Sequence, residues 1–255
     1  MLIDVHAHLD FPQFDRDRDS VVRNAKDNEI FIINSGIGRD GIEKTMKLVS
    51  EYDNVKATLG LSPTEFNTQI IEETIDLIRK YRDRIVGIGE VGLDYYWVKD
   101  SEKRRTELEN FRRFIDLAEE LDLPLVIHSR DAEGDVINEL KRKNLPALLH
   151  CFGGTLKQAE DAISFGCLIS IPTNVVYSKQ KQLLSKEIPL ESMVLETDSP
   201  YLAPVPKTRN EPVNVRLSAE KIAEIRGIEL SAVEDITTNN ARSFFNQRLA
   251  GNPTL

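Results

Sequence analysis

The chain has 255 residues, of which 40% are hydrophobic and 29% are charged, and this balance predicts a folded globular protein. Its formal net charge of −9 argues against a broad basic surface for duplex DNA. A phosphate-bearing substrate stays compatible with that charge, because bound divalent cations dominate the local field of a site. No stretch approaches the roughly 18 consecutive apolar residues that a membrane-spanning helix needs.

The cysteine content points to a reducing compartment. Only two cysteines are present, Cys151 and Cys167, and each lies in an apolar run, so we expect buried free thiols rather than a disulfide framework. The first apolar strand begins at residue 1, which leaves no room for a secretory leader. We therefore expect a cytoplasmic protein that binds no membrane, and no stable protein partner is inferred.

Apolar segments of strand length alternate with amphipathic helical segments along the chain. The expected strands cover residues 1–8, 30–34, 55–60, 85–90, 123–128, 146–150, 166–171 and 193–196. Expected helices lie between them, loops cover 35–38 and 91–97, and closing helices follow at about 212–250, where Ser218 and Ser231 are expected capping residues. Eight such units predict an α/β fold: one domain, 1–255, built as a closed (β/α)8 TIM barrel, with an open doubly wound sheet as the alternative.

The motif Asp4-Val5-His6-Ala7-His8 ends the first expected strand. Residues two apart on a strand point to the same side, so His6 and His8 would offer two imidazoles to one point, with Asp4 behind them. Taken alone, the motif fits a pair of hydrogen-bonded core histidines equally well. The other two histidines, His128 and His150, also end short apolar segments, which favours a metal site over scattered core histidines.

Active sites of TIM barrels are built at the carboxyl ends of the strands, so polar residues there indicate function. Six potential ligands fall at such strand ends: His6, His8, Glu90, His128, His150 and Asp198. A single catalytic zinc takes three protein ligands and a water, so six ligands suit two metal ions that share a carboxylate. Taken alone, Glu90 could form an ordinary salt bridge, and Asp198 could belong to a turn. The six residues together indicate a metal site more strongly than any one of them does.

The chain resembles the TatD family of metal-dependent deoxyribonucleases, in the amidohydrolase-like group of barrels. The resemblance covers nearly the whole length and rests on several motifs in order: Asp4-Val5-His6-Ala7-His8, Gly89-Glu90-Val91-Gly92-Leu93-Asp94, Ile127-His128-Ser129-Arg130, His150-Cys151-Phe152 and Glu196-Thr197-Asp198-Ser199-Pro200. It implies one metal ion held by His6, His8, Glu90 and Asp198, and a second held by Glu90, His128 and His150. Zinc, magnesium, manganese and nickel all suit such ligands.

Two positions depart from the family pattern. Ser62 stands where a histidine is common after the third strand, and Gly153 stands where a serine is common after His150. Neither position is an expected metal ligand. Metal binding should therefore be retained. The reaction rate and the choice of substrate are the properties that these two changes would alter.

The expected reaction is metal-dependent hydrolysis of phosphodiesters in single-stranded DNA by an exonuclease that uses a hydroxide activated by two metals. Glu90 and Asp198 are the catalytic candidates, Glu90 as the shared ligand and Asp198 as the acceptor of the water proton. Arg130 would contact phosphate, and Tyr95 and Tyr201 would stack on bases; a surface arginine and an apolar plug are the plainer interpretations.

Two alternatives stay open at the level of sequence. The same ligands would serve a metal-dependent deacylase or amidohydrolase, for example a D-aminoacyl-tRNA deacylase, because a bridged hydroxide attacks either electrophile. A non-catalytic metal-binding barrel is suggested by Ser62 and Gly153, but the complete ligand set argues against it.

Overall fold

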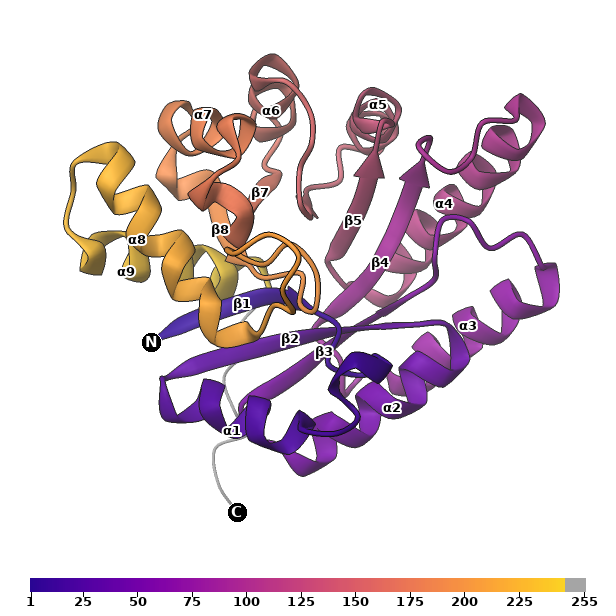
Figure 1. Cartoon of the computed structure of the whole chain (residues 1–255). Coiled ribbons are helices and arrows are strands. Elements are labelled where there is room, and N and C mark those ends of the chain that lie inside the picture. Colours follow the sequence, from indigo (N-terminus) through magenta and orange to yellow (C-terminus); the bar gives the residue numbers. More distant parts are fainter. Residues whose placement is uncertain (246–255) are drawn as a thin grey trace.

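A computed structural model describes residues 1–245, and its eight parallel strands form one sheet with neighbours in chain order, as the TIM-barrel prediction requires. The strands surround a central core, and the helices lie outside them (Figure 1). The strands are β1 (Leu2–Ala7), β2 (Ile30–Ile37), β3 (Val55–Gly60), β4 (Gly87–Asp94), β5 (Leu125–Arg130), β6 (Ala147–Leu149), β7 (Leu168–Pro172) and β8 (Met193–Glu196).

Each strand is followed by a helix, as the alternating pattern predicts. The α-helices are α1 (Arg18–Asp27), α2 (Gly38–Glu51), α3 (Thr68–Tyr81), α4 (Ser101–Leu121), α5 (Glu133–Lys143), α6 (Leu156–Ile163), α7 (Lys179–Glu187), α8 (Val215–Arg226) and α9 (Leu230–Phe244). The last two occupy the range expected for closing helices, whose final part, 246–250, lies outside the described residues. No helix in the described part of the chain is long and apolar enough to cross a membrane.

The two expected capping serines do not cap. Ser218 is buried inside α8, which begins after Asn214, and Ser231 is the second residue of α9, which begins after Glu229. Both helices begin earlier than their serines because their first turns pack against the barrel: Val215 and Val233 are fully buried. Tertiary burial outweighs local capping preference here.

The barrel closes between β8 and β1 through the segment that follows β8. The backbone N–H of Asp198 donates to the His6 carbonyl at 2.9 Å, and that of His8 donates to the Ser199 carbonyl at 2.7 Å. The buried Asp4 carboxylate accepts the backbone N–H of Thr197 at 2.8 Å and its hydroxyl at 2.5 Å. Asp4 therefore ties the two ends of the barrel together and fixes His6 and His8 relative to Asp198.

An apolar layer fills the barrel interior below these polar strand ends. It contains buried side chains from β1, β2, β5, β6 and β8 and from the residue before β4, and it is covered by one residue of α9 and by Phe245, which follows α9: Ile3, Val5, Ile33, Val86, Val126, Leu148, Val194, Ala241 and Phe245. Such a close-packed floor holds the strand ends in fixed positions and excludes water from beneath them. The polar side chains above it are thus partly enclosed in a medium of low dielectric constant.

Strands β4 and β5 run further toward the barrel mouth than predicted. The segment 91–97 was expected to be a loop, yet β4 continues through Asp94, and β5 continues through Arg130 rather than ending at His128. The reason is Gly92, which pairs with His128 across the ladder and whose missing side chain allows the close approach. Strand β2 likewise runs through Ile37, where a loop was expected from Ser35.

Candidate active site

The two histidines of β1 point to the same place. The Nε2 atoms of His6 and His8 lie 3.1 Å apart, and both side chains are buried. The other nitrogen of the His8 ring, Nδ1, lies 3.0 Å from the Ser35 carbonyl oxygen on β2. This backbone contact fixes the ring so that its Nε2 faces the centre of the barrel mouth, as the spacing of two along a strand predicts.

Two carboxylates from other strand ends face these imidazoles. Glu90 Oε2, from β4, lies 3.4 Å from His6 Nε2 and 3.5 Å from His8 Nε2. Asp198 Oδ1, from the segment after β8, lies 3.8 Å and 3.5 Å from the same two nitrogens. Residues nearly 200 positions apart in the sequence are thus brought to one point by barrel closure.

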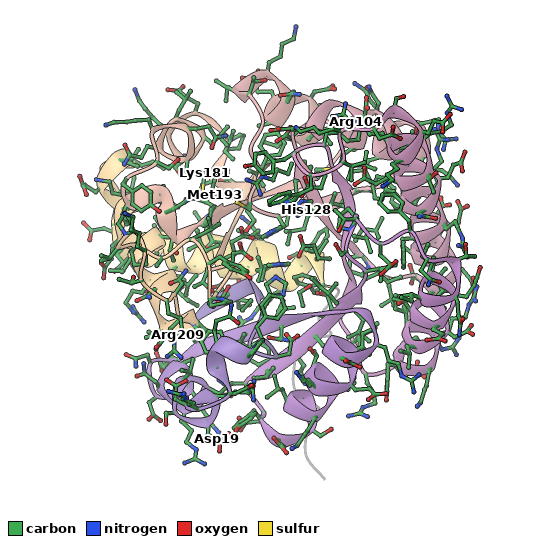
Figure 2. All side chains as sticks on the ribbon, turned by 45° about the vertical axis from the view of Figure 1, so that its right-hand side comes forward. Asp19, Arg104, His128, Lys181, Met193 and Arg209 are labelled. Carbon is green, nitrogen blue, oxygen red and sulfur yellow. The ribbon has the colours of Figure 1, made fainter. Side chains whose placement is uncertain are left out.

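The remaining two histidines meet the other oxygen of Glu90. Nδ1 of His128 lies 2.5 Å from Glu90 Oε1, and Nε2 of His150 lies 3.9 Å from the same atom. The His6 and His150 rings stack with their centroids 3.7 Å apart. Figure 2 shows His128 near the middle of the molecule, whereas Arg104 lies on the side of the outer helix α4. Glu90 therefore stands between the two histidine pairs, one on each carboxylate oxygen.

Further carboxylates, which the sequence analysis did not assign, hold two of these histidines from behind. Asp94 Oδ2 lies 2.9 Å from His128 Nε2. Glu196 Oε2 lies 3.0 Å from His150 Nδ1, while its Oε1 accepts the backbone N–H of Cys151 at 2.9 Å. Hydrogen bonds of this kind orient imidazoles that bind metals and raise their basicity. Both carboxylates are buried at strand ends, so their position at the mouth could have been predicted from the sequence, although their hydrogen-bond partners could not.

The charges of the cluster balance one another. Burial alone would raise the pKa of the Glu90 carboxyl, but the charge of His128 and hydrogen bonds from three imidazoles hold it well below its usual range. Burial would likewise lower the pKa of His128, yet Glu90 and Asp94 raise it to about 10. The pKa of His6 is lowered by burial and by His150. Glu90, which is ionised at neutral pH, thus faces His128, whose imidazole is protonated at that pH.

The donor set fits divalent metal ions. Two groups of potential ligand atoms each lie within 4.8 Å of one another: His6 with Glu90 and His150, and His6 with His8 and Asp198. Imidazole nitrogens with carboxylate oxygens are the ligands of catalytic zinc and of related divalent ions. His128 lies outside both groups of atoms but shares Glu90 Oε1 with His150. All six sequence candidates therefore meet at one mouth.

The three residues expected to bind substrate lie at the rim in different settings. Arg130 is exposed, with its guanidinium carbon 3.7 Å from the centre of the Tyr96 ring. Tyr95 is half-buried, and its hydroxyl donates to Asp135 at 2.8 Å. Tyr201 is 48% exposed and contacts Phe11 edge to face. Arg130 and Tyr201 therefore have free surface for a substrate, while the hydroxyl of Tyr95 is engaged within the protein.

The two positions that depart from the family pattern have distinct surroundings. Ser62 hydrogen-bonds the Thr64 hydroxyl at 2.9 Å, outside the histidine cluster. A side chain at Gly153 would place its Cβ 2.7 Å from Glu133 Oε1, so the Glu133 carboxylate fills the space that a serine would need. The expectation of buried free thiols holds for Cys167, whereas Cys151 is free but only half-buried.

A TIM barrel whose strand ends bring four histidines and two carboxylates together defines a class of metal-dependent hydrolases. A family model described as "TatD related DNase" matches residues 3–246, and the chain therefore belongs to the TatD family. This confirms the resemblance read from the motifs.

Relatives of nearly equal length support the assignment. The deoxyribonuclease TATDN3 of Homo sapiens is 37% identical over 258 residues, covering 96% of this chain and 94% of its own. An uncharacterized metal-dependent hydrolase, MJ1582, of Methanocaldococcus jannaschii is 36% identical, covering 97% and 98%. The crystal structure of the TatD homolog YJJV of Escherichia coli superposes with a TM-score of 0.88 at 26% identity, covering 96% and 98%. The match in fold extends over the whole barrel.

We expect the Glu196→Gln variant to bind divalent metal about 10- to 100-fold more weakly than the unaltered protein, because the amide loses the charge that orients and polarises His150. Calorimetric titration of the metal-stripped protein measures the change. The exposed Glu191→Gln serves as the control and should bind metal normally. Equal affinities for all three proteins would show that Glu196 does not support a ligand.

The stability of the metal-stripped protein should fall as the pH rises from about 6.5 to about 10. The folded protein raises the pKa of His128 to about 10 from a usual value of 6.5. A raised histidine pKa contributes stability fully below the unfolded value, and this contribution is lost as the pH rises through the folded value. Urea midpoints across this window measure the effect. His128→Gln should make the urea midpoint less dependent on pH. An unchanged dependence in this variant would show that His128 is not the group responsible.

Proposed function

We propose that the chain is a metal-dependent exodeoxyribonuclease that hydrolyses the phosphodiester bonds of single-stranded DNA. The observation that carries the proposal is the position of Glu90, whose two carboxylate oxygens face two separate histidine pairs. We further propose that the chain works in the cytoplasm as one domain, in keeping with its two free thiols.

Two divalent ions are proposed for this site, one held by His6, His8, Glu90 and Asp198 and the other by Glu90, His128 and His150. Zinc, magnesium, manganese or nickel would suit these ligands. Bound there, the ions would lower the pKa of a water and offset the negative charge of the phosphate in the transition state. The close-packed apolar floor would keep the ligands in place during the reaction.

The protein's own side chains have distinct roles in this proposal. The pKa of Asp198 is held low: burial would raise it, but hydrogen bonding from His8 and the nearby histidine charges outweigh that effect. Asp198 is therefore ionised at neutral pH, and with 14% of its side chain exposed it can accept a proton from the attacking water. Glu90, also ionised, keeps the histidine pairs together, and Arg130 contributes an exposed cation for phosphate at the rim.

Single-stranded DNA fits the surface better than duplex does. A net charge of −9 disfavours the long phosphate contacts of a duplex. Tyr96, Trp97 and Tyr201 are exposed aromatic side chains on segments that follow β4 and β8, at the mouth. Exposed rings bind unstacked bases, which only a single strand offers.

Metal-dependent cleavage of end-labelled oligonucleotides tests the proposal. We expect the protein to shorten a single strand stepwise in magnesium, manganese or zinc, to act more slowly on blunt duplex, and to be inactive after chelation. The product ladder gives the end that is attacked. Hydrolysis of aminoacyl-tRNA or amide substrates without any nucleolytic shortening would instead establish the deacylase alternative and refute the nuclease.

A further inference from the structure

A cleft of about 470 Å³ lies between the segment after β3 and the segment after β4. It is lined by Phe66 from the first segment and Trp97 from the second, and by two cations and one carboxylate: Lys99, Lys103 and Asp100. Trp97 is 67% exposed, the largest exposed fraction among the large hydrophobic side chains in the described part of the chain. Such exposure of an indole ring in a cleft indicates a binding surface.

The cleft is joined to the histidine cluster through one carboxylate. Asp94 Oδ2 lies 2.9 Å from His128 Nε2, and its Oδ1 accepts the backbone N–H of Trp97 at 2.9 Å. The same side chain therefore orients a proposed metal ligand and fixes the loop that carries the indole. A strand whose phosphate lies at the cluster would have its neighbouring nucleotides within reach of this loop.

The loop that presents Trp97 is braced from within. The Tyr95 carbonyl accepts hydrogen bonds from Lys99 Nζ at 2.8 Å and from Arg104 Nη2 at 3.1 Å. Arg104 Nε also donates to the Val98 carbonyl at 2.7 Å, and Val98 itself is buried. A loop backbone held in place in this way loses little conformational entropy when a base stacks on the ring that it carries.

The rim carries unpaired positive charge on an otherwise acidic protein. Some exposed basic side chains elsewhere form ion pairs, as Arg79 does with Glu120 and Lys141 with Asp161. Within the described residues, Lys99, Lys103 and Arg130 pair with no carboxylate; Lys103 lies over Phe66 at 5.9 Å, and Lys99 and Arg130 both lie over Tyr96. Cations that lie over aromatic rings complement a strand that alternates phosphates and bases.

We propose that this cleft is a base-binding subsite for single-stranded nucleic acid, in which one nucleobase stacks on Trp97 beside Phe66 and the adjacent phosphates pair with Lys99 and Lys103. The inference rests on the proposed function, since the occupant is the part of the strand that extends from the bond at the cluster. It assigns binding of flanking nucleotides to residues outside the proposed metal ligands.

Trp97 is the chain's one tryptophan, so intrinsic fluorescence reports directly on the cleft. The metal-loaded protein is titrated with phosphorothioate oligothymidylate, which resists hydrolysis, and with a dinucleotide of the same chemistry. We expect saturable quenching by the oligonucleotide and much weaker quenching by the dinucleotide. In parallel, hydrolysis of bis(p-nitrophenyl) phosphate tests the cluster alone.

Variants identify the contacts by anisotropy of a labelled oligonucleotide. Trp97→Ala should weaken binding roughly tenfold, and Trp97→Phe should retain most of the affinity because it keeps an aromatic face. Each of Lys99→Ala and Lys103→Ala should reduce the salt dependence of binding by about 0.7 in the log–log slope. Lys47→Ala, an exposed lysine late in α2, is the matched control and should bind normally.

The two proposals fail in different ways. Phosphodiester hydrolysis without tryptophan quenching, or equal affinity of Trp97→Ala and the unaltered protein, would overturn the subsite and leave the nuclease intact. Quenching and variant effects as expected, with no metal-dependent hydrolysis of either substrate, would overturn the nuclease and leave the subsite. If Lys47→Ala lost as much affinity as Lys103→Ala, the lysines of the cleft would contribute only non-specific electrostatic attraction. That result would also overturn the subsite.

Discussion

Glu90→Gln should reduce metal-dependent phosphodiester hydrolysis on the order of 1000-fold or more, the largest loss expected for any single substitution in the cluster. Glu90 Oε1 lies 2.5 Å from His128, while Oε2 lies 3.4 Å from His6. Glutamine keeps the size and shape of the glutamate side chain, but it replaces one carboxylate oxygen with an amide NH₂ group. One pair of imidazoles would then face a hydrogen-bond donor in place of an anion. Both proposed ions would lose a shared ligand at once.

The test compares metal content and cleavage of a labelled single strand for the two proteins. We expect Glu90→Gln to hold less than the full complement of metal and to leave the strand intact at times when the unaltered protein has degraded it. Glu160→Gln, an exposed residue of α6, controls for the change of charge and should cleave normally. Full activity in Glu90→Gln would remove the shared carboxylate from the mechanism.

Much of the barrel and all six candidate ligands were readable in the sequence because they follow from local periodicity. Apolar runs of strand length that end in His6, His128 or His150 show where a buried strand reaches the polar mouth. Parallel strands then bring their carboxyl ends together, so the ligands converge without any knowledge of distances. The comparisons confirm the family that these motifs indicate.

What the sequence did not show depends on contacts between distant segments. Asp4 was placed behind the histidines, but its hydrogen bonds to Thr197 across 193 residues exist only once the barrel closes. Asp94 falls in the segment 91–97, which is predicted as a loop, whereas β4 continues through it. Its contacts with His128 and Trp97 depend on the register of β4 against β5, which no local pattern encodes.

Gly92 shows how that register links stability to the site. Its φ of +148° is a conformation that side chains of L-residues rarely adopt, and an added Cβ would lie 2.0 Å from the carbonyl oxygen of His128. Gly92→Ala must therefore push β4 away from β5 at the level of His128. We expect a loss of about 2–5 kcal/mol in the free energy of unfolding, combining overpacking with backbone strain.

The same displacement should separate His128 from Glu90, so metal affinity and hydrolysis should fall together with stability in Gly92→Ala. Urea unfolding and metal titration of one preparation measure both quantities. Gly134→Ala is the matched control: it lies in α5, the nearest atom to its added Cβ is 3.6 Å away, and alanine there should stabilise the helix by up to about 1 kcal/mol. A Gly92→Ala protein with unaltered unfolding midpoint would mean that β4 and β5 tolerate a wider spacing, and the close approach of these strands would then not be what positions His128.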